Sequence, residues 1–369
     1  MQRSTTLTPA YRGIRKPSPP LLLTPVGVGA LCFVVALAVS AVVRHQVGFS
    51  GDEPYYARIA DHPAGPHNFP YAFRIGVPYL VHVLPFSHGF SWKLLALVAS
   101  AVAAGALFAL LREFDVSAEL AAGLSAGFVI SPPLLVVYLR NGIEVDPAAI
   151  MIIMLGSLFI VRRQRIALGI VLLAGTTVHE SCLFLIPFAY AVWARWLIDL
   201  DALRDLLVVA ALPILVYVYL RTSIVAVGEV YQPGYTGGVI SARVDVLRDA
   251  LGHGGWRQEI RRMALAYGPL WLAAPFALPK LPFARRGLVL FVLCLGSMTF
   301  ALDWGRMVFF AAPVIYVSAA YVLKDRRRLA VLAVVGLLAV DAGYAIYMQV
   351  HGVTHGLDST APPARGPVT

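Results

Sequence analysis

The sequence has few charged residues and few cysteines. Asp, Glu, Lys and Arg together make up 14% of the 369 residues, whereas soluble domains contain about a quarter. No long polar stretch is present from which a separate soluble domain could be built. The three cysteines lie in apolar runs and form no CxxC pair, so neither a disulfide framework nor a thiolate metal site is indicated. The HExxH pattern of zinc proteases is also missing.

Apolar residues are abundant instead. They make up 59% of the chain, and the mean hydropathy is +0.75. One water-soluble core cannot bury so much apolar surface, which predicts that the bilayer is the solvent. Because a spanning helix needs about 20 apolar residues, we expect an all-α, polytopic transmembrane helical bundle with about 10–11 spanning helices and no soluble domain. The expected spans are 21–43, 93–111, 118–139, 147–161, 166–178, 182–194, 206–220, 263–279, 287–301, 307–323 and 329–348.

The positive charges indicate how the chain is oriented. The net charge of +10 comes from short Lys and Arg clusters between apolar runs, which argues for topology rather than nucleic-acid binding. Of the 30 Lys and Arg residues, 17 fall on the side that the positive-inside rule assigns to the cytoplasm. We expect a cytoplasmic tail over 1–20, a transmembrane domain over 21–350 with outer loops at 44–92 and 221–262, and a disordered tail over 351–369.

Charged and polar residues at the predicted helix ends gather on the outer side. A charge at membrane depth is costly unless it faces a cavity or a partner. A polar cleft at the outer face is therefore expected. The residues concerned are Asp52, Glu53, Arg74, Arg140, Glu144, Asp146, His179, Glu180, Arg221, Asp303 and Arg306.

Two adjacent acids, Asp52 and Glu53, open the first outer loop, and Pro54 follows them directly. Such carboxylates can supply a general base. A proline is also well tolerated in the first turn of a helix, which makes Asp52 a natural N-cap for a short helix. The spacing alone leaves both roles open.

The segment from Asp52 to Ala60 resembles the D-E-x-x-Y-A-x-I-A signature of the GT-C superfamily of glycosyltransferases. The similarity is to the branch of protein O-mannosyltransferases and lipid A aminoarabinose transferases. It implies a bacterial plasma-membrane enzyme whose outward-facing site takes sugar from a polyprenyl-phosphate donor. It also implies that Asp52 acts as the base or organises the acceptor site, with Glu53 in support.

The sequence departs from this family in two respects. Many relatives follow the acidic motif with Lys-Pro-Pro, whereas this chain has an aromatic-x-x-Arg-x-x-x-Pro-x-Leu element between residues 69 and 80, similar to smaller bacterial members. The large C-terminal soluble domain of many relatives is also missing from the sequence. The sugar and the acceptor therefore do not carry over.

Arginines would suit the chemistry that the resemblance implies. Sugar transfer from a lipid phosphate expels a phosphate whose negative charge grows in the transition state, and a guanidinium can bind it with two parallel hydrogen bonds. Arg74, Arg140 and Arg306 are candidates, and Arg221 lies in a less distinctive setting. Each could instead snorkel to lipid headgroups from a helix end.

Other polar groups could hold the sugar or the acceptor. Glu144 and Asp146 are able to accept hydrogen bonds from hydroxyls, although Asp146 before Pro147 is also a natural helix cap, which we favour for it. The pair His179 and Glu180 interrupts two apolar runs and resembles a His-Glu or Arg-Glu element of small relatives.

Asp303 and Arg306 have the i, i+3 spacing that brings two side chains together on one helix face. They could form a self-contained ion pair, or Asp303 could orient Arg306 toward the donor phosphate. Asp341, inside the last span, has no evident sequence partner and receives no role.

We therefore expect an inverting glycosyltransferase with a lipid, glycan or protein acceptor. The assigned catalytic residues are Asp52 and Glu53, and the assigned substrate-binding residues are Arg74, Arg140, Glu144, Asp146, His179, Glu180, Asp303 and Arg306. The acids could also hold a divalent cation. Alternatives are a transporter or flippase, which would place polar groups near the midplane and often show repeats, a polysaccharide polymerase or ligase, and a nonenzymatic scaffold.

Overall fold

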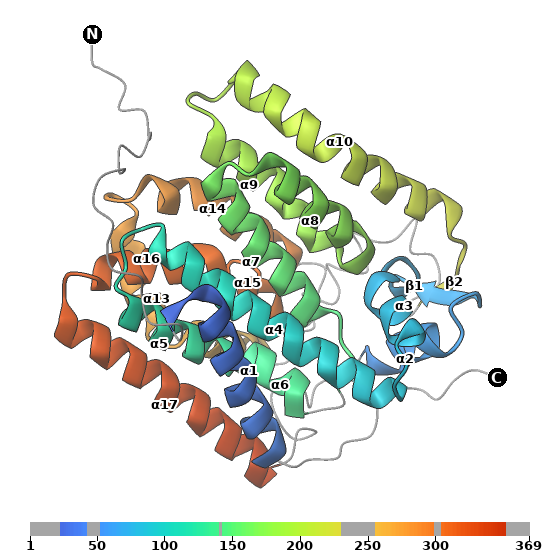
Figure 1. Cartoon of the computed structure of the whole chain (residues 1–369), viewed down its shortest axis with the longest axis horizontal. Coiled ribbons are helices and arrows are strands. Elements are labelled where there is room, and N and C mark those ends of the chain that lie inside the picture. The colour runs from blue at the N-terminus through green and yellow to red at the C-terminus, as the bar shows by residue number, and fades with distance from the viewer. Residues whose placement is uncertain (1–22, 43–51, 140–141, 230–254, 299–303, 352–369) are drawn as a thin grey trace.

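The computed structural model describes residues 23–42, 52–139, 142–229, 255–298 and 304–351. Nearly all of them are helical, and the only strands in these ranges form one pair, so the all-α expectation is confirmed (Figure 1). The predicted tails at 1–20 and after 351, together with the predicted site residues Arg140 and Asp303, lie outside the described residues.

The elements follow one another in a fixed order along the chain. They are α1 (Pro25–Val42), α2 (Glu53–Asp61), β1 (His67–Phe69), η2 (Tyr71–Phe73), α3 (Gly76–Val83), α4 (His88–Arg112), α5 (Ala118–Val129), α6 (Pro132–Leu139), α7 (Asp146–Arg162), α8 (Arg165–Val178), η3 (Glu180–Phe184), α9 (Leu185–Trp193), α10 (Leu200–Ser223), β2 (Ala226–Glu229), α12 (Gly255–Tyr267), α13 (Leu270–Ala273), η4 (Ala274–Ala277), α14 (Pro282–Ser297), α15 (Trp304–Phe309), α16 (Ala312–Leu323) and α17 (Arg327–His351).

Helix α4 forms the centre of the bundle and packs against α1, α5 and α7. Seven of its sixteen buried residues are alanines, which let neighbouring helices approach closely. One close approach is to α1, where a Cβ on Gly105 would lie 2.6 Å from the carbonyl oxygen of Pro25. Only glycine fits there, and it fixes the distance between these two helices.

Three of the expected single spans are broken in the structure. The segment 263–279 is divided between α12 and α13 at Gly268, which has a φ of +48°, and Pro269 follows it. Helices α5 and α6, which cover 118–139, are bent by 51°. The segment 307–323 is divided between α15 and α16, just before Pro313. Breaks at glycine and proline have a physical cause, because both residues disrupt regular helix geometry.

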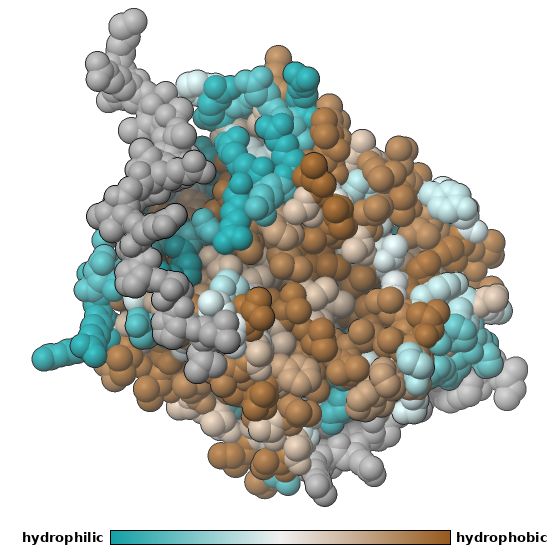
Figure 2. Space-filling model, viewed as in Figure 1, coloured by the Kyte–Doolittle hydropathy of each residue, from teal (hydrophilic) through white to brown (hydrophobic). Residues whose placement is uncertain are grey.

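Four helices in the described ranges are long and apolar enough to cross a membrane, judged by length and composition: α1, α4, α10 and α17. A fifth is added if the bent pair α5–α6 counts as one span. Figure 2 shows a broad brown apolar surface across the middle of the molecule. Teal hydrophilic side chains lie at the top and left, and a smaller teal and white area lies at the right, where Figure 1 places α2 and β1.

The first predicted outer loop contains several ordered elements. A short helix follows Pro54 as expected, and β1, η2 and α3 come after it. Strand β1 pairs in parallel with β2, with His67 opposite Ala226. This pairing joins the two predicted outer loops, 44–92 and 221–262, and places the end of α10 beside α2 and α3 at the right of Figure 1.

Candidate functional site

Asp52 occupies the N-cap position of α2, but its side chain is engaged elsewhere. It makes no capping bond to the backbone of α2, all of whose residues are described. Its Oδ1 accepts a hydrogen bond of 2.5 Å from the hydroxyl of Tyr71, and its Oδ2 lies 3.4 Å from Nη2 of Arg306. The carboxylate therefore does not cap α2, and it points toward Tyr71 and Arg306 instead.

Arg306, on α15, gathers three carboxylates from two separate segments. Its Nη1 lies 3.3 Å from Oε1 of Glu144 and 3.1 Å from Oδ2 of Asp146, in addition to the contact with Asp52. The N-cap of α7 is Val145, and Asp146 is the first residue of the helix. The expectation that Asp146 mainly caps α7 is therefore wrong. We call Arg306 with Asp52, Glu144 and Asp146 the Arg306 cluster.

Within the Arg306 cluster, the surroundings shift the pKa values of Asp52 and Glu144 in opposite directions. Burial alone would raise the pKa of Asp52, but Arg306, Tyr71 and Arg74 outweigh it and hold this pKa below its usual range. Burial raises the pKa of Glu144 well above its ordinary value, against the influence of Arg306, and the neighbouring acids raise it further. The surroundings thus stabilise the charged form of Asp52 and destabilise the charged form of Glu144.

Arg74 forms a second cluster beside the first. Its Nε and Nη2 donate to Oε2 and Oε1 of Glu180 at 3.1 and 2.5 Å, a two-bonded geometry, and its Nη1 donates to the hydroxyl of Tyr56 at 2.8 Å. The Arg74 side chain is only 12% exposed. Burial favours the neutral forms of both partners, but their mutual attraction lowers the pKa of Glu180 and raises that of Arg74.

Arg221 also belongs to this second cluster, which we call the Arg74 cluster: Arg74, Tyr56, Glu180 and Arg221. Its Nη2 lies 3.6 Å from Oε2 of Glu180, and its guanidinium lies 4.2 Å from the ring centre of Phe73. The sequence offered little reason to choose Arg221. Arg221 lies at the end of α10, and only the tertiary fold brings it into contact with η2.

Two tyrosines connect the clusters, and the sequence analysis assigned neither to the site. The hydroxyl of Tyr71 bonds Asp52, while the Tyr71 ring lies 5.9 Å from the guanidinium of Arg74. Tyr56, within the acidic motif, packs edge-on against Tyr71 at 5.1 Å and bonds Arg74. A local signal existed for both, because Tyr56 lies within the acidic motif and Tyr71 is the aromatic residue of the aromatic-x-x-Arg element that contains Arg74.

His179 supports the turn that presents Glu180. Its Nδ1 accepts a hydrogen bond of 3.1 Å from the backbone N–H of Ser181, and its ring packs 5.4 Å from that of Phe310. Nδ1 lies 4.0 Å from Oε2 of Glu180. Burial lowers the pKa of His179 to about 4, and Arg74 contributes to the decrease. The ring is therefore neutral at pH 7 and acts here as a hydrogen-bond acceptor.

The acids and histidines could also serve as ligands for a metal. Among the residues that the structure describes, no group of three or more His, Cys, Asp or Glu is arranged to hold one. The three acids of the Arg306 cluster surround a guanidinium, which occupies the position that a cation would take. Glu53 is fully buried beside them, and its charge contributes to the raised pKa of Glu144.

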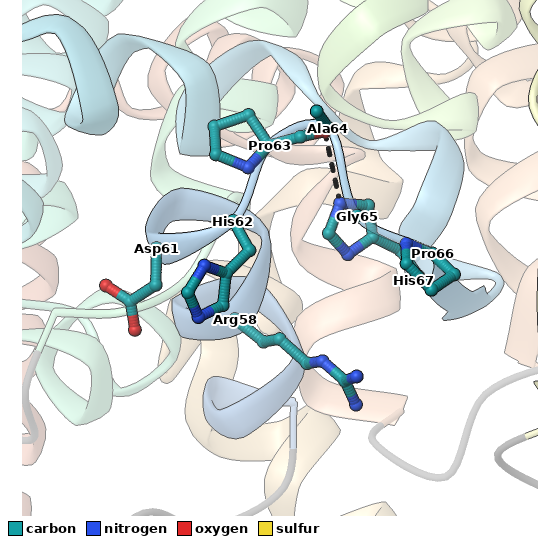
Figure 3. Close-up of a pocket in the computed structure, with 8 residues that line it drawn as sticks. All are labelled: Arg58, Asp61, His62, Pro63, Ala64, Gly65, Pro66 and His67. Atoms are coloured by element: carbon teal, nitrogen blue, oxygen red, sulfur yellow. Dashed lines mark hydrogen bonds between the residues drawn. The ribbon is translucent and has the colours of Figure 1, made fainter.

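An open depression lies at the other end of α2 and is shown in Figure 3. It is formed by the continuous segment from Arg58 to His67. Asp61 and His62 on its rim are exposed, while His67 is buried and contacts the carbonyl oxygen of Pro63 at 3.3 Å. Because its groups are local and mostly in contact with water, the depression lacks the convergent buried charges of the two clusters.

No known protein family and no curated protein matches this chain. Function is therefore inferred from the two clusters, the acidic motif and the chemistry that these groups can perform.

Proposed function

We propose that the protein is an integral membrane glycosyltransferase that moves a sugar from a polyprenyl-phosphate donor to a lipid, glycan or protein acceptor at the extracytoplasmic face. One observation carries the proposal. Asp52, the acid of the motif that resembles the GT-C signature, is the carboxylate at which a tyrosine hydroxyl and the Arg306 guanidinium meet. The Arg74 cluster adds two more guanidinium groups next to it.

The surface of the bundle supports placement in a bilayer. Helix α10 exposes Leu207, Val208 and Leu215 by 59%, 74% and 66%, and α17 exposes a comparable apolar face. Apolar surfaces of this extent are unusual on soluble monomers. Lipid would cover them, and the donor's polyprenyl tail could reach the site along the same surface.

The proposed reaction uses the two kinds of charged group differently. Arg306 and Arg74 bind the donor phosphate, whose negative charge grows as the bond between the sugar C1 and the phosphate oxygen breaks. Asp52 accepts the proton of the acceptor hydroxyl. At the same time, the oxygen of that hydroxyl forms the new bond to C1 from the face opposite the phosphate. The products are an inverted glycoside and a polyprenyl phosphate. Glu144 and Asp146 are placed to bind sugar hydroxyls.

The membrane placement can be tested by labelling introduced cysteines in a variant without the three native ones. Ala64→Cys, in the segment after α2, should react with an impermeant maleimide added outside intact cells. Arg327→Cys, at the start of α17, should react only after the cells are made permeable. Both positions are exposed on the protein. Labelling of both from the same side would overturn the orientation on which the proposed site depends.

The activity can be tested with purified protein and a panel of polyprenyl-phosphate sugars. Release of polyprenyl phosphate that requires an acceptor would support the transferase. Movement of the intact donor across a vesicle membrane, with the sugar–phosphate bond unbroken, would favour a flippase. Growth of a glycan chain on the lipid carrier would favour a polymerase. Absence of bond cleavage throughout a broad panel would count against the proposal.

A further inference from the structure

A buried ion pair lies on α12, outside both clusters. Glu259 and Arg262 are 6% and 7% exposed, and Nη1 of Arg262 donates to Oε1 of Glu259 at 2.5 Å. The same helix exposes Arg257 and Arg261 on its opposite face. Burying two charges is costly even when they pair with each other, so the contacts of this pair with neighbouring elements are informative.

The other oxygen of Glu259 holds the beginning of α15. Its Oε2 accepts a hydrogen bond of 3.0 Å from the backbone N–H of Trp304, the first residue of that helix. The next residue, Gly305, packs directly on α12, because a Cβ there would lie 3.0 Å from Cβ of Arg262. Arg306 follows, so the contact is two residues from the guanidinium of the Arg306 cluster.

The end of α12 holds the end of α15 as well. The hydroxyl of Tyr267, the last residue of α12, donates a hydrogen bond of 2.8 Å to the carbonyl oxygen of Val308. Helix α15 has only six residues, and so short a helix has little stability of its own. The two bonds from α12 therefore contribute to its orientation, together with its packing against α14 and α6.

We propose that Glu259 is a positioning residue for the candidate active site: it holds α15 so that the guanidinium of Arg306 remains among Asp52, Glu144 and Asp146. The effect on donor binding rests on the proposed function. The effect on α15 itself does not, because it follows from the contact between Glu259 and the backbone of Trp304.

A matched pair of double variants isolates this contact. Glu259→Leu/Arg262→Met and Glu259→Gln/Arg262→Met both remove the buried charges and keep similar side-chain volumes, which avoids leaving one charge buried alone. They differ in whether residue 259 can accept a hydrogen bond from Trp304. Hydrogen–deuterium exchange of residues 304–309 should be about fivefold faster in the Leu variant than in the Gln variant, because one hydrogen bond is worth about 1 kcal/mol.

Binding of decaprenyl phosphate in lipid nanodiscs supplies the second measurement. The Leu variant should bind it up to about fivefold more weakly than the Gln variant, and this difference should vanish when both also carry Arg306→Lys, because effects that act through one residue are not additive. Equal exchange in the two variants would overturn the proposal. So would a binding difference that persists with Arg306→Lys. If the wild-type protein does not bind decaprenyl phosphate, the proposed function is wrong, and the exchange measurement still decides how α15 is held.

Discussion

The two ends of the bundle carry charges in different ways. At the end with α2 and α15, Arg306 and Arg74 have side chains that are 25% and 12% exposed, and their acidic partners lie on segments distant in sequence. At the other end, Arg195 is 59% exposed and pairs with Asp199 and Asp201 a few residues away. Arg165 makes a similar exposed pair with Asp205.

This difference shows which charges call for a functional explanation. Exposed ion pairs contribute little to stability, and the positive-inside rule predicts Lys and Arg at whichever end faces the cytoplasm. Buried ionisable groups that converge from distant segments are costly to assemble, and they are concentrated at functional sites. Convergence and burial, rather than the number of charges, separate the candidate site from the opposite end.

The largest effect is expected from removing the proposed base. Asp52→Asn keeps the size of the side chain and an oxygen that can accept from Tyr71, but it cannot take up a proton at neutral pH. Transfer should fall by roughly 100-fold or more while the protein still folds, as measured by product formation and thermal unfolding. Asp61→Asn, at the exposed end of the same helix, is the control and should transfer normally. Near-normal transfer by Asp52→Asn would reject the assignment.

A smaller effect is expected from changing the shape of one cation. Arg306→Lys keeps the charge but loses the planar group that reaches three carboxylates, so decaprenyl phosphate should bind about tenfold more weakly. Arg165→Lys makes the same change in an exposed pair at the opposite end and should leave binding unchanged. An equal decrease in both variants would remove the distinction between the two ends.

The buried histidine predicts a pH effect on stability. Because the pKa of His179 is lowered from 6.5 to about 4 in the folded protein, the unfolded chain binds more protons between these values. The stability due to the neutral ring is complete above pH 6.5 and is lost as the pH falls toward 4. His179→Gln should therefore lose less thermal stability than the wild type between pH 7 and pH 4.5. Identical pH dependence of the two proteins would contradict the lowered pKa.

The smallest effect is expected at the exposed end. Arg195→Gln breaks the pairs with Asp199 and Asp201, yet thermal unfolding should stay within about 2 °C of the wild type. The Arg195 side chain is 59% exposed, and the buried carboxylate of Asp199 keeps its hydrogen bonds from the backbone N–H groups of Asp201 and Ala202. Transfer and phosphate binding should also be unchanged. A large loss of either would show that this end participates in function.

Several features of the fold could be predicted from local sequence. The apolar runs predicted helices at α1, α4, α10 and α17, and Pro54 predicted the short helix that follows Asp52. The apolar run 263–279 was misleading, because apolar residues alone do not reveal that the backbone turns at Gly268. Ten or eleven spans remain a prediction, since four or five helices in the described ranges satisfy length and composition.

Local sequence patterns are sufficient to predict that the chain is helical and apolar, and that acids and arginines occur at the helix ends. Both follow from properties read along the chain: hydrophobic runs of helix length, and charges that interrupt them. Three contacts are evident only in the folded chain. Asp52 turns away from its helix toward Arg306, Arg221 joins Arg74 at Glu180, and Glu259 bonds the start of α15. These contacts join segments up to 254 residues apart, and their formation depends on helix packing, which no local pattern specifies.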